Sequence, residues 1–164
     1  MSYDLYFFKQ LPGKTLAETF ASLTPDEPNY TDPLEALNTR EVADTLLALG
    51  LGLQEAESEA TDETIEINTA EPETIPIQIL IDENMVGISL PYWDVTTDSL
   101  NELKRQWSII APALENLGLS GYDPQANTRV TEASIDEMTI SVAQGAKDLA
   151  DAIAEAHKPW WKIW

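Results

Sequence analysis

The stretch that decides the fold runs Ile75-Pro76-Ile77-Gln78-Ile79-Leu80-Ile81, turns at Asp82-Glu83-Asn84 and returns as Met85-Val86-Gly87-Ile88-Ser89-Leu90-Pro91-Tyr92. Isoleucine occupies every second position on the way out, and apolar residues occupy every second position on the way back. This alternation is typical of half-buried strands, and a polar turn joins the two runs. The sequence therefore predicts a β-hairpin of residues 75–81 with 85–92, with Gln78 and Ser89 on its wetter side.

Outward from the hairpin, the pattern predicts further strands. The aromatic run 3–9 favours a strand close to the N-terminus. Residues 64–67 form the one expected strand of the polar segment 54–73, and residues 119–122 form another short strand before Asp123-Pro124-Gln125.

Helices are expected where apolar residues recur every three or four positions behind a capping residue. Residues 16–23 follow a capping box at Thr15 and Glu18, a second helix opens at Asn38, and a third follows a capping box at Ser99 and Glu102 and ends at Gly118. A last helix is expected from 135 to 157. The alternative is a strand over 139–142, with the helix starting near Gln144.

The resulting order, β-α-α-β-β-β-α-β-α, predicts an α+β fold. We expect a mainly antiparallel sheet of about five strands with the helices packed on one face. Residues 1–158 are expected to form a single domain, and residues 159–164 a tryptophan-rich tail.

The chain is strongly acidic. Its 164 residues include 29 Asp and Glu against 9 Lys and Arg, which gives a formal net charge of −20. Binding to nucleic acid is not expected, because phosphate binding needs clustered basic side chains. The apolar fraction of 43% is sufficient for a packed core. No apolar run approaches the roughly 18 residues of a membrane span. The opening residues lack a signal-peptide pattern, so we expect a cytoplasmic protein.

No catalytic or metal-binding motif is visible in the sequence. Cysteine is absent, and the one histidine, His157, stands near a predicted helix end without a serine elbow motif elsewhere. The glycines do not form a phosphate-binding loop, and no segment has the spacing of a calcium loop. We therefore expect no catalytic residue, no cofactor and no metal site.

The first sequence feature that suggests a function is a long run of acids. Residues 41–103 contain fifteen acids and no base. Such a run serves either as a solvated surface or as a docking face for a basic partner. The expected partner-binding residues are the acids of this run and the aromatics beside them: Glu55, Glu57, Glu59, Asp62, Glu63, Glu66, Asp82, Glu83, Tyr92, Trp93 and Asp94.

The second feature is the ending. Three of the five tryptophans, Trp160, Trp161 and Trp164, lie in the last five residues. The tail could complete the core, contact a partner or a second copy, or rest on a membrane surface, because tryptophan suits all three environments. We treat these tryptophans as a possible secondary contact.

Three patches carry a family resemblance: the opening MSYDLYFF (1–8), the corner LGLSGYDPQ (117–125) and the ending PWWKIW (159–164). Together they resemble small acidic bacterial immunity proteins, which protect cells from the toxins of type VI, contact-dependent and other polymorphic systems. The resemblance implies a cytoplasmic, non-enzymatic inhibitor that binds a cognate toxin domain and occludes its active site. It carries over no site residue.

Two other hypotheses follow from the residues. The acids could bind a small cationic molecule or a divalent cation in a metabolic or regulatory α+β protein. Alternatively, the tryptophan-rich tail could drive self-association.

Overall fold

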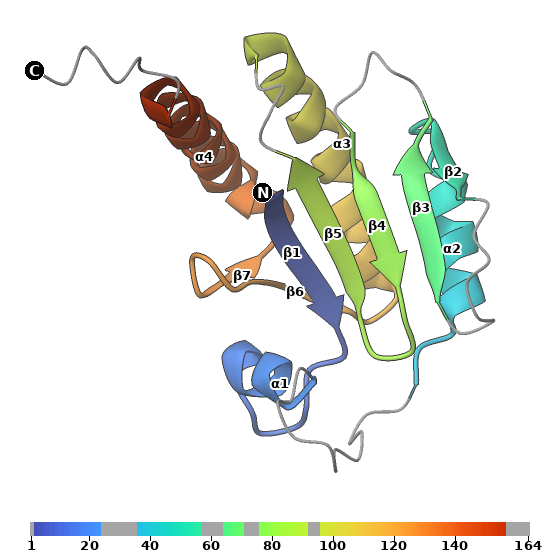
Figure 1. The fold of residues 1–164 in the computed structure, drawn as a ribbon. Coiled ribbons are helices and arrows are strands. Elements are labelled where there is room, and N and C mark those ends of the chain that lie inside the picture. Colours follow the sequence, from blue (N-terminus) through green and yellow to red (C-terminus); the bar gives the residue numbers. More distant parts are fainter. Residues whose placement is uncertain (1, 24–35, 57–63, 71–75, 92–95, 157–164) are drawn as a thin grey trace, which may run out of the picture.

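Within the residues that the structure describes, seven strands form one sheet, and all of them are paired antiparallel (Figure 1). The computed structural model describes residues 2–23, 36–56, 64–70, 76–91 and 96–156. The strands are β1 (Ser2–Phe8), β2 (Leu53–Glu55), β3 (Ile65–Thr69), β4 (Gln78–Ile81), β5 (Val86–Pro91), β6 (Ser120–Asp123) and β7 (Thr128–Val130). Their order across the sheet is β2-β3-β4-β5-β1-β6-β7, so the first strand of the chain lies near the middle.

Four helices accompany the sheet within the described ranges: α1 (Leu16–Leu23), α2 (Thr39–Leu47), α3 (Thr97–Asn116) and α4 (Ile135–Ala156). A single 3-10 turn, Glu132–Ser134, leads into α4. The expected α+β fold with an antiparallel sheet is confirmed. The last helix is continuous across 139–142, so the strand alternative for that segment is wrong.

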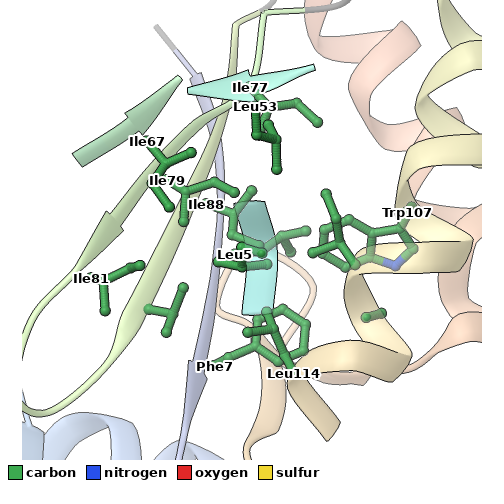
Figure 2. Packing of buried hydrophobic residues seen from close by; sticks show 14 of the residues in the cluster. Leu5, Phe7, Leu53, Ile67, Ile77, Ile79, Ile81, Ile88, Trp107 and Leu114 are labelled. Carbon is green, nitrogen blue, oxygen red and sulfur yellow. The ribbon is translucent and has the colours of Figure 1, made fainter. Parts of the chain in front are cut away.

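One face of the sheet, called the inner face from here on, packs against α2, α3 and α4. The hairpin alternation builds it, because the register sets Ile67, Ile79, Ile88 and Leu5 side by side across four strands, all fully buried. Figure 2 shows these side chains directed toward Trp107 and Leu114 of α3. Burial of large apolar side chains at this density is the main stabilising contribution to such a fold.

On the opposite face, called the outer face, α1 is the one described helix, and it lies at one end. Phe20 of α1 lies against Tyr6 and Tyr122, with ring centroids 4.8 and 5.3 Å apart. With Phe8 and Leu23 these rings form a second, smaller core. The expectation that all helices share one face is therefore corrected for α1: its apolar stripe meets the aromatic side chains that β1 and β6 turn outward.

The sheet also has more strands than the expected number of about five. The two unforeseen strands, β2 and β7, have three residues each and form the two edges of the sheet. Short edge strands limit unwanted pairing with other chains. Three residues are too few to display an alternating pattern, which is why the sequence did not reveal them.

The start of α3 differs from the prediction as well. The N-cap is Thr96, and Ser99 occupies the third helical position and completes a reciprocal capping box. The helix then continues through Pro112 to Asn116. In the described part of the chain, no helix combines the length and apolar character that a membrane crossing requires.

Candidate functional site

The described acids among the expected partner-binding residues lie on different parts of the fold. Glu55 is on the helix side of edge strand β2, where its carboxylate accepts two hydrogen bonds from Arg40 at 2.8 and 3.0 Å. These hydrogen bonds hold the pKa of Glu55 below its ordinary value and raise the pKa of Arg40. Glu55 is therefore engaged in an ion pair within the chain, and its place on a docking face stays a prediction.

Asp82 has a local structural role in the β4–β5 turn. Its Oδ1 atom accepts hydrogen bonds from the backbone N–H groups of Asn84 and Met85 at 2.7 and 2.8 Å. Such a side-chain turn is what aspartate supplies at the tip of a hairpin. Glu83 beside it is exposed, and its backbone carbonyl accepts a hydrogen bond from the Leu37 N–H at 2.7 Å.

Among the described acids of the expected site, Glu66 lies on the outer face, as the second residue of β3. Its Oε1 atom accepts hydrogen bonds from Asn68 Nδ2 and Gln78 Nε2, both at 2.9 Å. These two hydrogen bonds lower the pKa of Glu66, and the bond from Asn68 has the larger effect. The carboxylate is thus held ionised and in one orientation by its strand neighbours.

The other expected site residues lie outside the described residues. They are Glu57, Glu59, Asp62, Glu63, Tyr92, Trp93, Asp94, Trp160, Trp161 and Trp164.

Around Glu66 the register builds two rows of side chains across the outer face. The first row is Glu66, Leu80, Gly87 and Tyr6, and the second is Gln54, Asn68, Gln78, Ser89 and Asp4. No described helix lies over β3, β4 and β5 on this side (Figure 1). Gln78 and Ser89 lie on this wetter side of the hairpin, as the alternation predicted.

Leu80 is the residue of this face that sequence reasoning missed. It is 45% exposed, and Ile140 on α4 is the other large apolar side chain that is clearly exposed among the described residues. The hairpin sequence already indicated this position, because Leu80 alternates with the isoleucines in the same way as Pro76 and Gln78, whose side chains face outward. An apolar residue in the outward phase of a central strand is typical of a contact surface rather than of a core.

The charge on this part of the sheet has a single sign. Among the five neighbouring strands β2, β3, β4, β5 and β1, three contain one acid each (β1, β2 and β3), and none contains lysine or arginine. On the outer face the acids are Glu66 and Asp4, with polar amides and hydroxyls between them. The outer-face patch, defined here as Glu66, Asn68, Gln78, Leu80, Gly87, Ser89 and Asp4, is therefore acidic and polar around an exposed leucine.

A small cavity of about 30 Å³ lies on the other side of the sheet, between β1, β6, β7 and α4. Its lining includes Tyr3 and the buried Asp123. Asp123 accepts hydrogen bonds from the Tyr3 hydroxyl and from the backbone N–H groups of Gln125 and Ala126 at 2.8 and 3.0 Å. The cavity has room for little more than water, and its carboxylate is already bound on both oxygens, so it is a structural network.

Comparisons of the chain with protein-family models, with curated proteins and with solved structures found no match.

Proposed function

We propose that this chain is a non-enzymatic immunity protein of a bacterial toxin system, which binds a basic toxin domain through the outer-face patch and occludes its active site. The observation that carries the proposal is the run of five neighbouring strands without a basic residue, with Leu80 exposed at its centre. The resemblance of the opening, the corner and the ending to immunity proteins adds to it.

Two physical effects would make such a surface effective. A field of one sign accelerates encounter with a basic partner and rejects acidic ones. Interfaces then depend on a few desolvated side chains near their centre, surrounded by polar contacts. Leu80 has that position between Glu66 and Gly87 in the register. If the toxin acts on a nucleic acid, the carboxylates would take the place of substrate phosphates in a basic cleft.

The test is co-expression with the toxin-like product of the neighbouring gene, followed by titration calorimetry of the purified pair. Growth rescue together with tight binding would support the proposal. The variant Leu80→Lys should weaken binding by about tenfold or more, which is the cost of about 1.4 kcal/mol at a central contact. Ile140→Lys is the matched control, because Ile140 is 69% exposed on α4, away from the patch.

Absence of both rescue and binding would refute the proposal. Equal losses for the two lysine variants would refute the outer-face patch as the binding surface. The hypothesis of a small cationic ligand or divalent cation has less support: within the described ranges, no three His, Cys, Asp or Glu side chains are grouped so as to hold a metal ion.

A further inference from the structure

The carboxylate of Glu66 is prepared for one particular kind of contact. Its Oε1 atom already accepts two hydrogen bonds, from Asn68 and Gln78, which uses both lone pairs of that oxygen. Its Oε2 atom accepts no hydrogen bond from the described part of the chain. A partner cation therefore meets one open oxygen on a carboxylate that its neighbours hold in place.

The surface next to Glu66 can receive an aliphatic stem. Leu80 is its direct neighbour across the β3–β4 pairing, and Gly87 follows across the β4–β5 pairing. A Cβ atom added at Gly87 would lie 3.7 Å from the nearest atom of Tyr6 and 3.9 Å from the Leu80 carbonyl oxygen, which are ordinary contact distances. Neither steric crowding nor backbone conformation thus requires glycine here, although glycine in a strand interior weakens the strand and often marks a close approach by another molecule.

We infer that Glu66, Leu80 and Gly87 form a receptor for a lysine side chain of the partner, whose ammonium group binds Glu66 Oε2 while its stem lies on Leu80 beside Gly87. Lysine fits better than arginine. A guanidinium reaches its full strength with a carboxylate through two parallel hydrogen bonds to both oxygens, and Oε1 is occupied. An ammonium group needs only one oxygen. This inference rests on the proposed function and specifies the chemistry that the partner presents to the patch.

The test uses three capped tripeptides, Gly-Lys-Gly, Gly-Arg-Gly and Gly-norleucine-Gly, titrated into the labelled full chain while amide NMR signals are recorded. The lysine peptide should shift the signals of Glu66, Leu80 and Gly87, and the uncharged norleucine peptide should shift them far less. The arginine peptide should bind no more tightly than the lysine peptide. Tighter binding of arginine, or shifts spread evenly over the acidic surface, would overturn the inference.

The variant Glu66→Gln isolates the contact. The glutamine carbonyl oxygen can still accept the bonds from Asn68 and Gln78, while the open oxygen becomes an NH₂ donor that repels ammonium. We expect up to about fivefold weaker binding of the lysine peptide, the range of an exposed ion pair. Glu83→Gln makes the same charge change at the exposed hairpin tip and should have no such effect. Equal effects of the two variants would overturn the inference.

A second pair of variants tests the stem. Gly87→Val adds bulk beside Leu80 and should abolish the lysine-specific shifts, whereas Ser120→Val adds similar bulk on β6, outside the outer-face patch, and should retain them. Retained shifts in Gly87→Val would contradict the inferred path of the stem.

The lysine receptor and the immunity function can fail separately. If the toxin binds and growth is rescued, but Glu66→Gln and Glu83→Gln bind the lysine peptide equally well, the lysine receptor fails and the immunity function stands. If the lysine peptide binds as described but no toxin is bound, the proposed function fails alone.

Discussion

At the scale of single residues, two glycines on neighbouring regions of the sheet differ in the space around them. A Cβ atom at Gly121 would lie 2.8 Å from a Phe7 ring atom and 2.9 Å from two atoms of Val130. Gly121→Ala should therefore lower the free energy of unfolding by about 1–3 kcal/mol through overpacking. Gly87→Ala meets only ordinary contacts and should be neutral or stabilising by up to about 1 kcal/mol. Urea denaturation of both variants measures the difference.

The comparison has a clear contrary result. If both alanine variants lose stability equally, close packing around Gly121 is not what distinguishes the two positions. An unchanged m-value in both variants would show that the two native states remain equally compact.

Single residues also show where sequence reasoning fails. Glu55, Glu66 and Asp82 are equivalent acids in the sequence, yet one is ion-paired to Arg40, one is held by amides on the outer face and one closes a turn. Their partners separate them. Glu55 is bound by Arg40, 15 residues away, and Glu66 by Gln78 on the next strand, 12 residues away, whereas Asp82 is bound by the backbone of its own turn. Only the last of these is local in sequence, so composition could predict the acidic surface but not which acid is available.

At the scale of elements, the contribution of the α3 N-cap to stability can be tested by substitution. Thr96 N–H donates to Ser99 Oγ at 2.7 Å, and Ser99 N–H donates to Thr96 Oγ1 at 3.2 Å. Thr96→Ala removes one half of this box and should destabilise the protein by about 1 kcal/mol. Thr97→Ala, at the first helical position, is the control and should change stability by only a few tenths of that. Thermal and urea denaturation measure both variants, and equal losses would argue against Thr96 as the N-cap.

The elements that the sequence predicted share a physical property: their patterns are long and local. The hairpin alternation placed β4 and β5, and the three-to-four spacing placed α1, α2, α3 and α4. Edge strand β2 depends instead on pairing with β3, where Leu53 meets Thr69, and the folded sheet brings these residues near. Edge strand β7 pairs with β6 across a short local turn, but its three residues are too few to show a pattern. The side of the sheet that α1 covers likewise depends on contacts with Tyr122, about a hundred positions along the chain from Phe20.

At the scale of the whole molecule, self-repulsion should be measurable. The net charge is −20, and three of the described bases, Arg40, Lys104 and Arg105, are already engaged in short ion pairs with acids. Raising ionic strength from 0.01 M to 1 M shortens the screening length from about 30 Å to about 3 Å. The urea midpoint should therefore rise with added NaCl, because relief of the general repulsion outweighs the weakening of a few exposed pairs. Urea is preferable to guanidinium chloride, which is itself a salt.

The pH dependence at high salt then isolates the other electrostatic contribution. Hydrogen bonds donated by Asn68 and Gln78 lower the pKa of Glu66 below the ordinary 4.5. A hydrogen bond donated by Arg105 lowers the pKa of Glu102 in the same way. A carboxyl whose pKa is lower in the folded state contributes stability above its unfolded pKa and loses it as the pH falls through the folded value. In 1 M NaCl the urea midpoint should hold from pH 7 to about 5 and fall below about 4.5. The urea midpoint of Glu66→Gln should fall less on acidification than that of the unchanged chain. The midpoint of Glu83→Gln should fall as much as that of the unchanged chain. A midpoint that rises on acidification in high salt would mean that repulsion remains dominant even when it is screened.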